Sequence, residues 1–217
     1  MSKYGYVGKE SDIPQQAFKA NAGVLSVNDH LALSQENKLT QYGQLELIET
    51  QTVSSTVEYI IFDDIKQDIY NVHFMTINNL GKSANGSTLL TVSNDNGTTF
   101  ETANGDYQYA IQRTQTNGSF AEEKSTNPTS IRLTNTVGTG TGETANLYCY
   151  MYNLGDNTKY SFFTYHTCYG PNTSFAFGFG SAVYPTAETL NAFRIQTTVA
   201  NIIETADVSL YGIKEYS

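Results

Sequence analysis

Asn146 to Thr167 reads NLYCYMYNLGDNTKYSFFTYHT, and this stretch indicates the fold of the whole chain. In its first arm, three apolar residues alternate with three tyrosines, Tyr148, Tyr150 and Tyr152. The second arm shows the same period of two, and the Leu154-Gly-Asp-Asn157 segment between the arms is a turn signal. The stretch is therefore expected to form a β-hairpin with bulky side chains on both faces.

Both faces of this hairpin need cover, because each carries large rings. One face is expected to pack in a core. The other face could pack against a neighbouring sheet of the same monomer or against a partner subunit, and the sequence leaves both alternatives open. Tyrosine is favoured at surfaces that become buried only on assembly, so Tyr148, Tyr150 and Tyr152 are the candidate subunit interface.

The composition indicates one large β-rich domain. The chain has 217 residues with 17 glycines, 12% aromatic residues and only 15% charged residues, and the residues that favour long helices are scarce. The net charge of −9 argues against a nucleic-acid partner, because phosphate binding needs a cationic patch. The opening residues show no signal peptide, and no apolar run is long enough for a membrane helix, so no membrane partner is expected.

The two cysteines, Cys149 and Cys168, lie on or just past the two arms of the central hairpin. Their spacing is compatible with a disulfide. Two buried thiols in a protein made in a reducing cytosol are the favoured expectation.

Residues 1–44 differ from the rest and predict an extended arm with short ordered pieces. A disordered leader is the alternative, but the segment holds apolar side chains that a solvated tail would not need. Since these are too few for a core of their own, we predict that the arm attaches the protein to a larger particle, with strand addition supplying part of the stability. The candidate attachment residues are Tyr4, Tyr6, Val7, Phe18, Val24, Leu25 and Leu31.

Residues 45–217 predict an all-β body, a β-sandwich of about ten strands with a jelly roll as the best single topology. Besides the central hairpin, strands are expected at 45–49, 53–62, 70–74, 88–93, 98–102, 131–133, 175–179, 192–197 and 207–213. Asn94-Asp-Asn-Gly97 predicts a hairpin turn before the return strand 98–102. Residues 107–112 could be a strand or a short helix, 78–87 and 114–127 are expected loops, and 175–179 has the pattern of an edge or bent strand.

No catalytic, cofactor or metal site is expected from the motifs. The histidines have no neighbouring nucleophile or metal partner, and those at 73 and 166 are expected to be packed or edge residues; the three are His30, His73 and His166. Asp63, Asp64 and Asp68 are close enough in sequence to bind calcium, but their spacing matches no known loop, so a solvated acidic turn is favoured.

The closing residues Val208 to Tyr216, VSLYGIKEY, resemble the last strand of a large group of tailed-phage virion proteins, many from marine phages. Further similarities follow in the same order along the chain: Tyr4-Gly-Tyr-Val-Gly-Lys9, the strands around Ile60 and Val72, the Asn94-Asp-Asn-Gly97 turn, and Leu190 to Thr197. The resemblance implies a non-enzymatic structural protein of the virion, assembled in the host cytoplasm and usually a homotrimer. A head fibre, a capsid decoration protein, or a tail fibre or other tail appendage would fit, and no site residues are implied.

The partners expected from this interpretation are further copies of the chain and the major capsid protein or another virion protein. The alternative is a lectin-like receptor-binding tip, in which the predicted loops 79–87, 103–127 and 138–144 contact a host surface glycan. A glycan-degrading enzyme is disfavoured, because no motif presents a pair of carboxylates.

Overall fold

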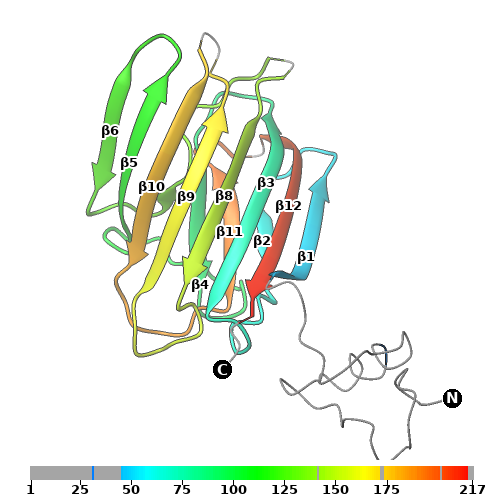
Figure 1. Ribbon diagram of the computed structural model, residues 1–217, viewed down its shortest axis with the longest axis vertical. Helices are drawn as coiled ribbons and strands as arrows, with labels where there is room; N and C mark the ends of the chain where they lie inside the picture. Colours follow the sequence, from blue (N-terminus) through cyan, green and yellow to red (C-terminus); the bar gives the residue numbers. More distant parts are fainter. Residues whose placement is uncertain (1–30, 32–44, 141, 172–173, 201, 215–217) are drawn as a thin grey trace, which may run out of the picture. The chain divides into compact units, whose positions relative to one another are not determined.

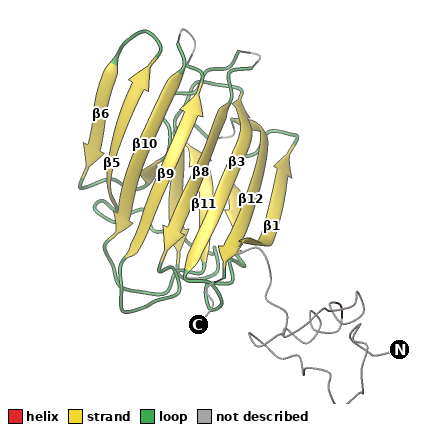
Figure 2. Cartoon of the chain, in the orientation of Figure 1, coloured by secondary structure: helices red, strands yellow, loops and turns green. Residues whose placement is uncertain are grey.

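The computed structural model describes residues 31, 45–140, 142–171, 174–200 and 202–214. From residue 45 onwards these form one unit built from strands, which confirms the predicted all-β body (Figures 1 and 2). The strands are β1 (Leu45–Val53), β2 (Ile60–Phe62), β3 (Val72–Lys82), β4 (Thr88–Ser93), β5 (Gln108–Gln115), β6 (Phe120–Ser125), β7 (Ile131–Arg132), β8 (Ala145–Tyr152), β9 (Ser161–Tyr169), β10 (Ala176–Tyr184), β11 (Ala192–Thr197) and β12 (Ile203–Ile213).

The strands make two antiparallel sheets packed face to face. The large sheet has the order β1-β12-β3-β8-β9-β10-β5-β6 and lies in front in Figure 1, and the small sheet has the order β2-β11-β4-β7. Eight strands follow a jelly-roll path between the sheets, with β1-β12-β3-β8 opposite β2-β11-β4-β7. The predicted jelly-roll-type sandwich is therefore confirmed.

Two hairpins interrupt this jelly roll and widen the large sheet only. The β5–β6 hairpin is inserted between β4 and β7, and the β9–β10 hairpin between β8 and β11. Because β9 pairs with β8 and β10 pairs with β5, the four inserted strands continue the large sheet beyond β8. The large sheet consequently has twice as many strands as the sheet that covers it.

The core lies between the two sheets and contains the inward residues of the period-two pattern. In β9, buried and exposed side chains alternate along the entire strand. The Phe62 and Phe193 rings of the small sheet stack with their centroids 5.0 Å apart. The largest fully buried side chains are Tyr107, Tyr165, Phe62, Phe163, Phe193, Ile60, Ile65, Met75, Ile77, Leu80, Leu90 and Ile131.

The Leu-Tyr-Gly-Ile-Lys segment of the closing strand has a packing role. Gly212 lies beneath the Tyr70 ring, and a Cβ at this position would be only 2.3 Å from the ring carbons. The Tyr70 hydroxyl donates to Glu46 Oε2 at 2.6 Å, and Lys214 Nζ pairs with Glu46 Oε1 at 3.2 Å. Burial together with the carboxylate raises the pKa of Tyr70 to about 12. The segment thus ties the last strand to β1 and to the loop before β3.

The prediction of a return strand at 98–102 is wrong. The turn itself forms, with positive φ at Asn96 and Gly97. The residues after the turn are held by a side chain rather than by strand pairing. The Asp95 carboxylate accepts hydrogen bonds from the Thr99 backbone N–H at 2.8 Å and from the Thr99 hydroxyl at 2.7 Å. One backbone bond, from Glu101 N to Val92 O at 2.9 Å, returns the chain towards β4.

The expected loop at 114–127 is also wrong, since it contains β6 and the tight turn that joins it to β5. The turn places Gly118 at a φ of 87°, and the Gln115 N–H donates to Ser119 O at 2.9 Å. Asn117-Gly118 was the missed signal for this hairpin. Because β5 pairs with β10, the strand predicted at 175–179 is interior rather than an edge.

Other boundaries differ by a few residues. The strand predicted at 53–62 is split, since β1 ends at Val53 and β2 begins at Ile60, and the expected loop at 78–87 begins late because β3 continues to Lys82. Residues 107–112 are resolved in favour of a strand, β5. Of the proposed attachment arm, Leu31 is described and exposed, and Tyr4, Tyr6, Val7, Phe18, Val24 and Leu25 lie outside the described residues.

Both cysteines are free thiols, and they occupy opposite faces of the large sheet. Cys149 is buried in the core, where burial raises the pKa of its thiol. Cys168 is exposed, so the expectation of two buried thiols holds for Cys149 and is wrong for Cys168. Cys149 pairs with Tyr165 on β9, which lies three residues before Cys168. Because paired residues share a face and side chains alternate along a strand, the two cysteines lie on opposite faces of the sheet.

Candidate functional site

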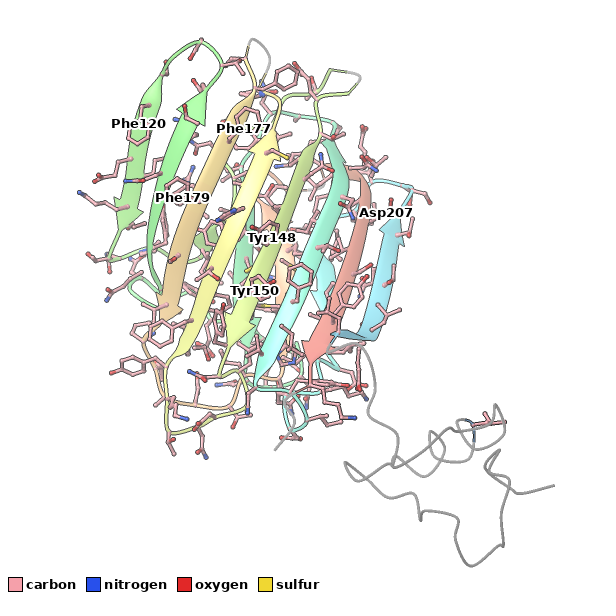
Figure 3. The ribbon with its side chains drawn as sticks, in the orientation of Figure 1. Phe120, Tyr148, Tyr150, Phe177, Phe179 and Asp207 are labelled. Carbon is pink, nitrogen blue, oxygen red and sulfur yellow. The ribbon has the colours of Figure 1, made fainter. Side chains whose placement is uncertain are left out.

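The outer surface of the large sheet, the side turned away from the small sheet, carries a continuous group of aromatic side chains. They come from alternate positions on six strands, and the antiparallel register places them in neighbouring rows (Figure 3). We call this surface the aromatic face; its rings are Phe74, Phe120, Tyr148, Tyr150, Tyr152, Phe162, His166, Phe177, Phe179 and Tyr211.

The part of the aromatic face on β3, β8 and β12 is a layer of rings that pack against one another. Phe74 is at its centre, with its ring centroid 4.7 Å from Tyr150, 6.0 Å from Tyr148 and 6.2 Å from Tyr211. Tyr150 in turn stacks on Tyr152 at 6.3 Å. We call these five residues the tyrosine half. Its rings partly shield one another, since Tyr148 is exposed and the other four rings are half-buried.

The part on the inserted strands β9, β10 and β6 is different in chemistry and exposure. Its four phenylalanines, Phe120, Phe162, Phe177 and Phe179, are between 46% and 69% exposed, and a phenyl ring has no polar group to offer to water. We call these four residues the phenylalanine half. Exposed apolar rings gathered on one surface mark an interaction site more often than single exposed residues do.

Tyr148 and His166 form the border between the two halves. The Tyr148 hydroxyl and His166 Nδ1 are 2.8 Å apart, and His166 also lies against the Phe179 ring with a centroid distance of 6.2 Å. Tyr148, His166, Phe179 and Gln112 together separate two shallow hollows of about 540 and 740 Å³. Rings, amide groups and hydroxyl groups line the hollows, together with Arg113 in the smaller hollow and Glu122 in the larger one.

The middle of this surface is free of formal charge. The five adjacent strands β3, β8, β9, β10 and β5 each present four outward side chains. These belong to the even-numbered residues of 72–78, 146–152, 162–168 and 108–114 and to the odd-numbered residues of 177–183. None of them is Asp, Glu, Lys or Arg. Charged side chains flank the strip on either side. Glu122 and Lys124 pair on β6, and Asp207 on β12 accepts from the Thr52 hydroxyl at 2.9 Å.

This arrangement has the anatomy of a protein–protein interface. Interface centres are depleted in charged residues and enriched in Tyr and Phe, and their rims are polar. The sequence predicted Tyr148, Tyr150 and Tyr152 as a subunit interface, and the structure places all three side chains on the aromatic face. It adds residues that sequence reasoning did not join to them, Phe74, Tyr211, His166 and the phenylalanine half. The outward phase of a period-two strand was the available signal for each of these.

The other candidate residues lie elsewhere. His73 is buried in the core with Nε2 2.7 Å from Ile65 O, and burial lowers its pKa. Asp63, Asp64 and Asp68 lie in the segment between β2 and β3, where Asp64 pairs with Lys66 at 2.5 Å. The loops expected to contact glycan are not all loops, because residues 79–82 belong to β3 and residues 108–125 contain the β5–β6 hairpin.

Within the described residues, no group of three or more His, Cys, Asp or Glu side chains is placed to hold a metal ion. No helix in this part of the chain is long and apolar enough to cross a membrane.

No family model matches the chain, and neither the curated proteins nor the solved structures include a match to it.

Proposed function

We propose that the chain is a non-enzymatic structural protein of a tailed-phage virion, and that it assembles as a homotrimer through the aromatic face. The single observation that carries the self-association is the charge-free strip of five strands with its exposed rings and charged flanks. In a protein whose net charge is −9, a water-facing surface of this extent without a charge needs a partner to cover it.

The size of the aromatic face agrees with this function. Five strands spaced ~4.8 Å apart and eight residues of ~3.3 Å each give a projected area of roughly 650 Å². The flanking strands β12 and β6 bring the whole surface above the ~800 Å² that a standard interface buries on one partner. In a trimer two neighbouring copies share this surface, and each buries roughly half of it.

The role in the virion rests on the resemblance of the sequence to phage virion proteins, which includes the closing segment Val208 to Tyr216. In this proposal the body displays a β-sandwich on a head fibre, a capsid decoration or a tail appendage. Residues 1–44 attach it to the major capsid protein or another virion protein. Deletion of residues 2–40 is expected to leave a folded trimer that no longer joins particles, and normal incorporation of the truncated protein would refute the attachment role.

The test of the interface is the mass in solution. Light scattering at micromolar concentration is expected to give three times the 23.9 kDa of one chain. Tyr150→Asp is expected to give monomers, because an unpaired carboxylate buried in an interface costs several kcal/mol. Tyr59→Asp is the matched control: Tyr59 is also an exposed tyrosine, but it stacks on Arg194 of the small sheet. A monomeric wild-type protein would refute the proposal.

A lectin-like function is the second candidate, and the hollows favour it. Rings interleaved with Asn146, Gln112 and Thr114 could stack on and hydrogen-bond a neutral saccharide. Calorimetry with neutral bacterial polysaccharides on wild-type protein and on Phe177→Ala separates the two functions. Saturable binding that the variant loses, by a wild-type monomer, would favour the lectin.

A further inference from the structure

The two halves of the aromatic face are complementary rather than alike, and a trimer needs complementary surfaces. A closed ring of three subunits cannot be built from self-complementary contacts, because each subunit must offer two different surfaces to its two neighbours. We propose that the subunits associate head to tail, with the tyrosine half of one copy covering the phenylalanine half of the next. This inference rests on the proposed self-association and adds which surface meets which.

Hydrogen bonding favours this pairing of unlike halves. Among the described residues the hydroxyl groups of Tyr150 and Tyr211 make no hydrogen bond within the chain, and they would need partners once covered. Between the rings of the phenylalanine half, the sheet presents outward amide and hydroxyl groups on β5, β9 and β10; these are Gln112, Thr114, Thr164 and Ser181. A head-to-tail contact brings hydroxyls to groups that can accept or donate.

The alternative contacts leave one half uncovered. A tyrosine half paired with itself leaves the more exposed phenyl rings in water. A phenylalanine half paired with itself covers those rings but leaves the tyrosine half unused. Head-to-tail association covers both halves in every subunit.

A mixing experiment tests the inference. Tyr150→Asp disables the tyrosine half and Phe179→Asp disables the phenylalanine half, so each variant keeps one working half. Each is expected to be a monomer alone at 10 µM by light scattering. Mixed in equal amounts, they are expected to form a one-to-one heterodimer of about twice the chain mass and nothing larger, because only one pair of working halves remains.

The other outcomes overturn the inference in distinguishable ways. Self-association of either variant alone would show that one half pairs with itself. A wild-type trimer whose two variants stay monomeric on mixing would exclude the head-to-tail arrangement and leave the self-association intact. A monomeric wild type would remove the proposed function as well. Far-UV circular dichroism checks that each variant is folded, and Tyr211→Asp replaces Tyr150→Asp if the latter is not.

Discussion

Gly212→Ala tests whether the closing strand depends on the close approach of Tyr70. The added Cβ would lie 2.3 Å from the Cγ and Cδ2 of the ring, far inside van der Waals contact. The ring cannot simply move away, because Tyr70 is only 8% exposed and its hydroxyl is bonded to Glu46 at 2.6 Å. The variant must therefore shift β12 or break this hydrogen bond.

The expected magnitude follows from two opposing effects. Overpacking a well-packed site costs about 1–3 kcal/mol, and the constraint on Tyr70 places this site near the upper end. Replacing a glycine within a strand returns about 0.5–1 kcal/mol. The net loss is roughly 2 kcal/mol, which for a chain of this length lowers the melting temperature by about 4–8 °C.

The assay is thermal and urea unfolding by circular dichroism at one fixed protein concentration, in the wild-type and Tyr70→Ala backgrounds. Without the ring, Gly212→Ala is expected to cost little, so the double-mutant cycle should show a coupling close to the full effect. An equal cost in both backgrounds, or no cost in the wild type, would refute the argument from the ring.

Three further predictions concern single residues. Burial lowers the pKa of Lys82 to about 7, so above that pH the unfolded chain binds more protons than the folded chain. The free energy of unfolding should therefore rise by up to ~1.4 kcal/mol per pH unit between about pH 7 and 9.5. Urea titrations should show this rise in the wild type and not in Lys82→Met. Hydrogen bonds from Thr99 and Ser93 lower the pKa of Asp95 to about 2, so Asp95→Ala should lower the melting temperature at pH 7 but much less below pH 2, where the carboxyl group is protonated; an equal loss at both pH values would contradict this. An aromatic thiol reagent should modify Cys168 rapidly in monomeric Tyr150→Asp and slowly in the assembled wild type, whereas Cys149 should react only after unfolding; equal rates at Cys168 would argue that the aromatic face is uncovered.

Local pattern was sufficient for much of the strand content. The period of two identified the central hairpin, and β4 and β11 have the predicted bounds. The pattern failed after Asp95, where side-chain hydrogen bonds take the place of the predicted strand pairing. It also failed at the Asn117-Gly118 turn, which was interpreted as part of a long loop. Both failures come from turn chemistry, which depends on one or two residues.

The sequence by itself determined which side chains share a face of each strand, because alternation along a strand is a local property of the extended backbone. That was enough to group Tyr148, Tyr150 and Tyr152. Only the tertiary structure decided that Phe74, Phe179 and Tyr211 join them, since strand order arises from contacts between distant segments, such as β3 with β12. It also decided which face is buried: the small sheet covers one side of the large sheet, and the aromatic rings on the other side remain exposed.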